Sequence, residues 1–240
     1  MKIQKIYKKA SISNPTNKRY ISENYIVLNL LFKKITPLIA YMLKKIKISA
    51  NFITILSIIL TIVGSIFIFY DKVVITAFCW IFALFFDSLD GDLARISDSS
   101  SKFGNQLDTF GSDIFYFFFP ISTATFLYKS ESFNNIFGVN FIFIGCLISF
   151  FFLSYRYINQ LNLRTKLSSS KIKKIKSKKE QRIFKFILKI INNEFIRGNL
   201  FSEPGMILIF FIFCFIKNFY LFEIYLYILL IFVFIKVIIS

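Results

Sequence analysis

The sequence has no histidine and few acidic residues, with 13 Asp and Glu among 240 positions. Imidazole is the side chain that most often moves protons or activates a nucleophile near neutral pH. Its absence excludes every histidine-based catalytic or metal site and leaves carboxylates to carry any acid–base chemistry. The three cysteines, Cys79, Cys146 and Cys214, lie far apart in apolar runs. They indicate neither a disulfide framework nor a zinc site, and we interpret them as small buried hydrophobic residues.

Apolar residues, by contrast, are abundant. They make up 56% of the chain, 34 residues are phenylalanine, and the mean hydropathy is +0.63. Several apolar runs approach the roughly 20 residues that an α-helix needs to cross a hydrocarbon core. The composition therefore predicts an all-α integral membrane protein, and the length fits one compact helix bundle.

The order of polar and apolar segments predicts two regions. Residues 1–50 form a basic arm followed by an apolar stretch, Tyr25–Lys47, which two lysines and Pro37 interrupt. Such a stretch favours an amphipathic helix lying in the membrane interface over a span. Residues 51–240 are predicted to form a bundle of six transmembrane helices with a basic loop at 156–203. The expected spans are residues 51–70, 73–95, 104–128, 136–155, 204–216 and 220–237.

The formal net charge of +17 is unevenly distributed along the chain. Six spans place both termini on one side, and all Lys and Arg except Lys72, Lys129 and Lys217 fall on that side. Positive residues favour the cytoplasmic side, so the termini, the loop and the acidic segment described next are predicted to be cytoplasmic, in an inner or plasma membrane. Anionic lipid headgroups are then the expected partners of the excess charge, and nucleic acid is not.

The few acidic residues are concentrated, because six of the 13 lie between Asp87 and Asp113. This segment covers the end of one predicted span and the start of the next. An ionisable group at membrane depth costs at least about 2.5–3.5 kcal/mol on insertion scales. A cost that recurs within one segment indicates a functional site rather than helix capping.

Helical geometry places part of this segment on one face. At about 100° per residue, four positions fall within a narrow arc: Asp87, Asp90, Gly91 and Ala94. Asp92 points elsewhere and is expected to be solvated. Carboxylate oxygens suit hard divalent cations, and small residues leave room for a bound ligand to approach the backbone.

A second pair of residues follows the short turn after this helix. Gly104 and Asp108 are one turn apart on the third predicted span, so they share a face. Two helix ends joined by a short turn can present Asp87, Asp90 and Asp108 to a common point. We therefore predict that these three side chains hold divalent metal ions.

This pattern resembles the signature of the CDP-alcohol phosphotransferase family, Asp-x2-Asp-Gly-x2-Ala-Arg-x8-Gly-x3-Asp-x3-Asp. Six spans with the motif at the second and third are also similar to the family. A further likeness is Asn51-Phe-Ile-Thr54 at the start of the first span, where members commonly have Pro before the Asn and this chain has Ala50. The matching positions are Asp87, Asp90, Gly91, Ala94, Arg95, Gly104 and Asp108.

The resemblance implies a transfer reaction in phospholipid biosynthesis. Members bind a CDP-linked alcohol, often CDP-diacylglycerol, with Mg²⁺ or Mn²⁺ held by the motif aspartates. A small hydroxylated acceptor attacks the phosphorus, and CMP leaves. The resemblance also implies a homodimer and a contact from Arg95 to nucleotide phosphate. The other implied substrate-binding residues are Gly91, Ala94, Gly104, Asn51 and Thr54.

The chain departs from the signature at its last position. The final Asp, which the resemblance implies is the general base, is replaced by Ser112, and Asp113 follows. In a regular helix Asp113 lies about 100° from the required direction, whereas a π-bulge near Phe110 and Gly111 would rotate it into place. Two alternatives to an active transferase stay open: a catalytically silent member that acts as a membrane binding or scaffold protein, and, with less support, an ion transporter. The residues do not name the acceptor.

Overall fold

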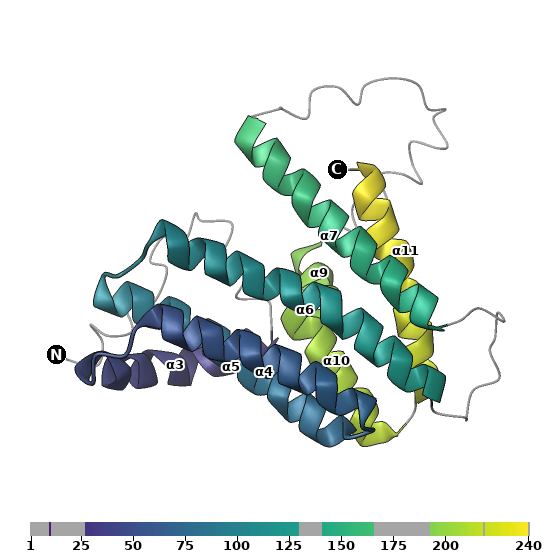
Figure 1. Ribbon diagram of the computed structural model, residues 1–240, viewed down its shortest axis with the longest axis horizontal. Helices are drawn as coiled ribbons and strands as arrows, with labels where there is room; N and C mark the ends of the chain where they lie inside the picture. The colour runs from purple at the N-terminus through teal and green to yellow at the C-terminus, as the bar shows by residue number, and fades with distance from the viewer. Residues whose placement is uncertain (1–9, 11–26, 130–140, 166–192, 218, 240) are drawn as a thin grey trace.

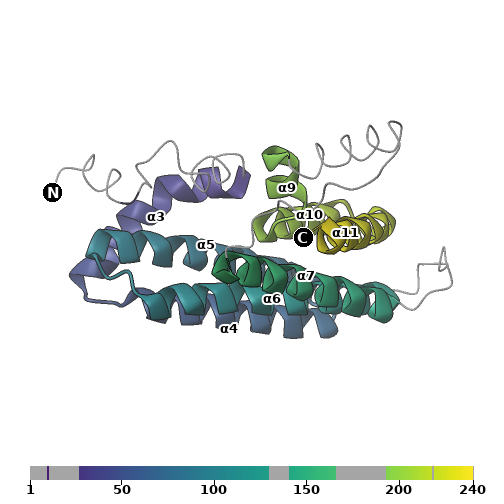
Figure 2. The same ribbon diagram turned by 90° about the horizontal axis from the view of Figure 1, so that it is seen from above.

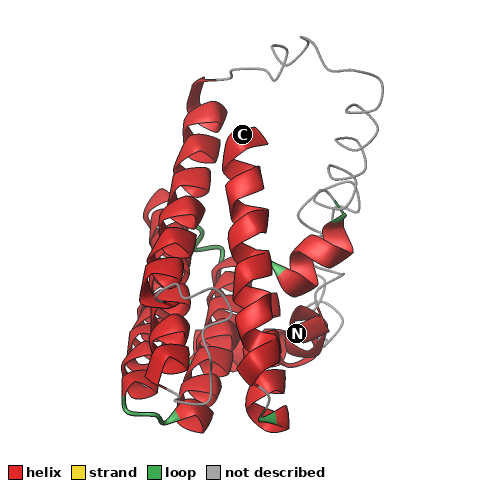
Figure 3. Cartoon of the chain, turned by 90° about the vertical axis from the view of Figure 1, so that its right-hand side faces the viewer, coloured by secondary structure: helices red, strands yellow, loops and turns green. Residues whose placement is uncertain are grey.

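The structure, a computed structural model, describes residue 10 and residues 27–129, 141–165, 193–217 and 219–239. Within these residues the chain is helical and has no strand, as Figure 3 shows. The predicted all-α architecture is therefore confirmed for the described part of the chain. Most of the predicted basic arm and much of the basic loop at 156–203 lie outside the described residues.

Five of the described helices are long and apolar enough to cross a membrane. They are α4 (Ala50–Phe69), α5 (Val73–Ser97), α6 (Lys102–Lys129), α7 (Phe141–Thr165) and α11 (Phe219–Ile239). The predicted fifth span corresponds to α10 (Glu203–Ile216), which has 14 residues. A helix of that length covers about 21 Å, less than the ~30 Å of a hydrocarbon core. The six-span count is thus not confirmed, and the described residues hold five candidate spans of an integral membrane protein.

The helix α3 (Val27–Lys45) corresponds to the predicted interfacial segment. It packs along α5 through an apolar cluster that includes Ala40, Leu89 and Leu93. Lys44 Nζ, near its end, donates a hydrogen bond of 2.8 Å to the carbonyl of Ile96. Figure 2 shows α3 on one side of α5 and α4 on the other. The location of α3 at a membrane surface stays a prediction.

The two faces of α4 reverse the pattern of a helix in a soluble protein. Ser57, Thr61 and Gly64 are buried, whereas Ile55 and Ile59 are 45% and 48% exposed. Small side chains let neighbouring helices approach closely, and large apolar side chains suit a lipid environment. The buried hydroxyl of Thr61 donates to the Ser57 carbonyl at 3.0 Å, so it needs no partner from outside the helix. This arrangement is typical of a helix within a bilayer.

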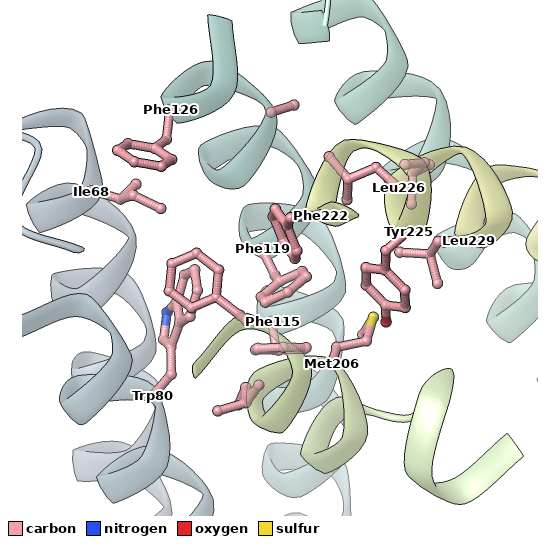
Figure 4. Close-up of a cluster of buried hydrophobic side chains, with 14 of the residues drawn as sticks. Ile68, Trp80, Phe115, Phe119, Phe126, Met206, Phe222, Tyr225, Leu226 and Leu229 are labelled. Carbon is pink, nitrogen blue, oxygen red and sulfur yellow. The ribbon is translucent and has the colours of Figure 1, made fainter. Parts of the chain in front are cut away.

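An aromatic core joins α5, α6 and α10 (Figure 4). The buried Trp80 ring of α5 lies 4.9 Å from Phe119 of α6 and 5.1 Å from Phe210 of α10, measured between ring centroids. Phe115 packs 5.0 Å from Phe119, and Met206 of α10 is buried in the same cluster. The core therefore fixes the first turns of α10 against α5 and α6.

The order of packing brings the acidic ends of two helices together. As Figure 1 shows, α4 packs against both α5 and α6, while α7 packs against α6 and α11. Residues 98–101 join α5 to α6 in a short turn, so the end of α5 and the start of α6 lie at the same end of the bundle. The short helix α9 (Glu194–Leu200) precedes α10.

The close approach of α4 to α5 can be tested at Gly64. A β-carbon at this position would lie 2.9 Å from both Cys79 Cβ and Trp80 Cδ1. Gly64→Ala is therefore expected to destabilise the protein by about 1–3 kcal/mol. The melting temperature, followed in detergent micelles by the fluorescence of the single tryptophan, should fall. Gly111→Ala is the control, because its β-carbon would meet the movable Ile58 side chain at 3.2 Å. Equal melting temperatures for the two variants would contradict the packing.

Candidate active site

The site begins where α5 and α6 bring two carboxylates together. Asp87 lies on α5 and Asp108 on α6, and both are half-buried. Their side chains lie at hydrogen-bonding distance, and Asp87 also interacts electrostatically with Asp90. Asp90 in turn interacts with Asp108. Carboxylates this close repel one another unless they share a proton or a cation, so the arrangement favours a positively charged ligand.

Asp90 is the most enclosed of the three, with an exposed fraction of 7%. The Thr54 hydroxyl, which donates to the Ala50 carbonyl at 3.2 Å, and the Gly91 N–H both lie near enough to its carboxylate to stabilise the charge. Its Oδ2 atom is buried and has no hydrogen-bond partner among the described residues. A buried polar atom without a partner is costly and is usually satisfied by water, an ion or a ligand. Asp90 is therefore flanked by polar groups, and its Oδ2 atom makes no hydrogen bond to the described residues.

The start of α4 contributes a second group of predicted residues. A β-carbon at Gly104 would lie 3.0 Å from Asn51 Oδ1 and 3.3 Å from Ser101 Oγ. The Gly104 N–H donates a hydrogen bond of 2.9 Å to that Ser101 oxygen. The glycine thus lets the start of α6 approach α4. Asn51 and Gly104 face each other at the same end of the bundle as the aspartates.

Arg95 is anchored within the protein. Its Nη2 donates to Asp92 Oδ1 at 2.6 Å, and its Nε donates to the Ala10 carbonyl at 2.7 Å. The guanidinium also lies over Gly91, where a β-carbon would be 3.3 Å from Nη1. The absence of a side chain at Gly91 therefore makes room for an arginine of this chain. Ala94 is half-buried, and its contact with a donor, like that of Arg95, stays a prediction.

The expectation that Asp92 is solvated is wrong. Asp92 has an exposed fraction of 6%, and its Oδ2 accepts a hydrogen bond of 2.6 Å from Thr36 Oγ1 of α3. The reason is that α3 covers this face of α5. The direction of Asp92 away from the other aspartates follows from the helical repeat, but what meets it there is a contact between segments far apart in the sequence.

At the last signature position α6 is a continuous α-helix, without a π-bulge at Phe110. Ser112 therefore keeps the position that the signature gives to an aspartate. Asp113 forms an ion pair with Arg156 Nε of α7. Arg156 also donates from Nη2 to the Thr109 carbonyl at 3.2 Å, which fixes it along α6. Asp113 is thus turned toward α7 and paired with a cation.

A fourth carboxylate, which the sequence analysis missed, lies beside these residues. Glu203 is the first residue of α10, and the Ser112 hydroxyl lies near enough to its carboxylate to stabilise the charge. Its charge interacts with Asp108 and Asp87 and is partly balanced by Arg156. The charges of four acidic side chains from α5, α6 and α10 therefore influence one another.

A signal for Glu203 was present in the sequence. It is one of only 13 acidic residues and stands directly before Pro204, at the start of an apolar run. A carboxylate at the end of an apolar helix is the feature that singled out Asp87. The prediction instead assigned Glu203 to the end of the basic loop, because nothing local shows that α10 begins against α6.

A pocket of about 260 Å³ lies next to Glu203. Tyr116 and Ser202 form part of its wall, and the Glu203 N–H donates a hydrogen bond to the Tyr116 hydroxyl. Two cations, Arg156 and Lys236, also line it, together with the rings of aromatic residues. The pocket therefore combines an apolar wall with positive charge, and Ser202 in its wall directly precedes Glu203.

The donor atoms of the acidic residues suit Mg²⁺ and Mn²⁺, because they are all oxygens. Among the described residues, no three acidic or cysteine side chains are gathered closely enough to hold one ion as they stand. The open Oδ2 of Asp90 and the neighbouring pair of carboxylates nonetheless fit a divalent ion in charge and chemistry.

The sequence profile of the CDP-alcohol phosphatidyltransferases matches residues 47–235. The chain belongs to this family. The match runs from just before α4 into the last turns of α11 and includes all four acidic residues. Membership in the CDP-alcohol phosphatidyltransferase family assigns the chain to transferases that move a phospho-alcohol group from a CDP-alcohol in lipid synthesis. A search of curated proteins gave no match to this chain.

The buried position of Asp92 gives a test of how α3 is held. Asp92→Asn removes the charge that Arg95 and Thr36 share, and is expected to destabilise the protein by about 1–3 kcal/mol. The lower part of this range is expected, because the Arg95 side chain is 34% exposed and its ion pair is screened by solvent. The melting temperature in detergent should fall below that of Asp71→Asn, a control at an exposed turn. If both variants melt like the wild type, Asp92 does not secure α3.

Proposed function

We propose that this protein transfers a phosphatidyl or related phospho-alcohol group from a CDP-alcohol to the hydroxyl of a small acceptor, and that CMP is released. CDP-diacylglycerol is the donor we favour. The observation that carries the proposal is the mutual interaction of Asp87, Asp90 and Asp108 inside the region that matches the family. This is the part of the chain where acidic residues are most costly and therefore most in need of a function.

Mg²⁺ or Mn²⁺ would be held by Asp87, Asp90 and Asp108. Such an ion supplies positive charge to the pyrophosphate and to the leaving CMP oxygen. Thr54 and the Gly91 N–H stabilise the Asp90 charge, while Oδ2 makes no hydrogen bond to the described residues. Preorganised ligands reduce the cost of ordering side chains when a substrate binds.

Arg95 is well placed to meet a phosphate of the donor. Asp92 and the Ala10 carbonyl fix its guanidinium over Gly91, one residue from Asp90. Its charge also interacts with Asp90, which places it at the edge of the acidic residues. A rigid guanidinium binds phosphate oxygens with little loss of side-chain entropy.

The pocket next to Glu203 is a candidate site for the acceptor. Its volume of about 260 Å³ suits a small hydroxylated molecule. Its wall includes Tyr116, which interacts with Glu203, so an acceptor there would lie on the side of Glu203. Holding two reactants side by side contributes to the rate without any covalent step by the enzyme.

The distribution of positive charge supports an orientation with both termini and this site on the cytoplasmic side of an inner or plasma membrane. There the basic residues would meet anionic lipid headgroups. A lipid donor would reach the site from the membrane and a polar acceptor from water. A homodimer, implied by the family resemblance, also belongs to this proposal.

A catalytically silent member of the family is the second candidate. Ser112 replaces the last aspartate of the signature, and Asp113 is paired with Arg156. Loss of a general base typically lowers a rate by about 10²–10⁴-fold. A silent member would bind a CDP-alcohol without releasing CMP.

The two candidates differ in one assay. Purified protein with Mg²⁺ or Mn²⁺ and labelled CDP-diacylglycerol is expected to release CMP when a suitable acceptor from a panel of polyols, amino alcohols and their phosphates is added. Asp108→Asn should lower this release by more than about 10²-fold, because the site loses one of its charges. Asp71→Asn, at an exposed turn, should leave the release unchanged.

The outcome also decides the alternative. If nucleotide binding is intact but CMP is absent for every acceptor, the protein is the silent member. If Asp108→Asn releases CMP like the wild type, the acidic residues are not the site of the reaction.

A further inference from the structure

We propose that Glu203 supplies the carboxylate that is absent at position 112 and accepts the proton of the attacking acceptor hydroxyl. This inference rests on the proposed function. It starts from a mismatch within the site: the signature ends with an acidic residue on α6, and here α6 carries Ser112. The structure places a carboxylate from another helix, α10, at that position.

Glu203 of α10 interacts with the Ser112 side chain of α6. The Ser112 hydroxyl lies near enough to the Glu203 carboxylate to stabilise its charge. The shorter serine therefore leaves space on α6 that a longer acidic side chain from α10 fills.

Glu203 lies between the acidic residues and the candidate acceptor pocket. On one side its charge interacts with Asp108 and Asp87. On the other side its N–H binds Tyr116, and its neighbour Ser202 lines the pocket. A base must lie within hydrogen-bond reach of the hydroxyl that it deprotonates, and this hydroxyl must face the donor phosphate. Glu203 stands between the candidate acceptor pocket and the acidic residues that would hold the donor.

Glu203 is held in place at the start of α10, whereas Asp113 is paired with Arg156 of α7. Met206, one turn further along α10, is fully buried in the aromatic core (Figure 4), and Pro204 stiffens the first turn. Asp113 instead forms an ion pair with Arg156 on the side of α6 that faces α7. Arg156 also balances part of the charge on Glu203. Glu203 nonetheless interacts with the Ser112 side chain, whereas Asp113 is bound on the side of α6 that faces α7.

The proposed step combines a proton transfer with a displacement at phosphorus. The acceptor O–H bond breaks, its proton passes to a Glu203 carboxylate oxygen, and the acceptor oxygen forms a bond to the donor phosphorus. The bond between that phosphorus and the CMP oxygen breaks, and CMP leaves with the bonding electron pair. Water then takes the proton from Glu203, which restores the carboxylate.

The test compares Glu203→Gln with a restored signature. Glu203→Gln keeps the shape of the side chain but removes its basicity, so kcat for CMP release should fall about 10²–10⁴-fold. The KM for the CDP-alcohol donor and the Kd for CDP should stay close to the wild-type values, since Glu203 is assigned to the acceptor. In the double variant Ser112→Asp with Glu203→Gln, an aspartate stands at the signature position, and kcat should recover at least about tenfold.

Two controls separate this role from a structural one. Glu223→Gln, a matched change in α11 outside the site, should leave kcat unchanged. Melting temperatures in detergent should be similar for the wild type, Glu203→Gln and the double variant. A glutamate that merely positions α10 would not be replaced by an aspartate on α6.

The outcomes are distinct from those of the proposed function. If the wild type releases CMP and Glu203→Gln does so equally fast, Glu203 is not the base although the transfer reaction stands. The same conclusion follows if kcat falls but Ser112→Asp restores none of it. If the wild type releases no CMP with any acceptor, the proposed function fails and the role of Glu203 fails with it.

Discussion

The proposed function depends on four carboxylates that lie at one end of an apolar helix bundle and repel one another. Asp87, Asp90, Asp108 and Glu203 come from three helices and interact with one another. Charges this close in a medium less polar than water interact strongly, so each must be offset by a cation, a proton or a hydrogen-bond donor. The protein offsets only part of this negative charge. It does so with two cations, Arg95 and Arg156, and with the polar groups of Thr54, Gly91 and Ser112. The unpartnered Oδ2 of Asp90 shows where the compensation is incomplete, and a divalent cation would complete it.

The remainder of the fold holds these groups in place against their repulsion. The small residues of α4 bring α5 close, and Thr54 of the same helix holds Asp90. The aromatic core around Trp80 fixes α10, whose first residue is Glu203. On the opposite face of α5, Thr36 of α3 binds Asp92, and Asp92 in turn fixes Arg95. These supporting contacts lie in closely packed apolar regions of the protein. Close packing keeps the side chains of the site in fixed positions.

Local features of the sequence were enough to predict the positions of Asp87, Asp90 and Asp108 at one end of the bundle, because helix spacing and a short turn determine them. The environment of Asp92 and the presence of Glu203 could not be predicted in this way. Both depend on helices, α3 and α10, that approach from segments about 50 or more residues away. The count of spans was also uncertain from composition, since α10 is apolar throughout but has only 14 residues. Ser112 by itself indicates only that α6 lacks the last carboxylate of the signature. The position of Glu203 at the start of α10 indicates that another helix supplies one.

The proposed function requires that these carboxylates hold divalent metal ions. The most direct measurement is anomalous X-ray scattering from crystals of the protein grown with Mn²⁺ and CDP. We expect manganese peaks bounded by oxygens of Asp87, Asp90 and Asp108, and their loss in Asp87→Asn crystals. Well-ordered carboxylates with bound CDP and no manganese between them would contradict it.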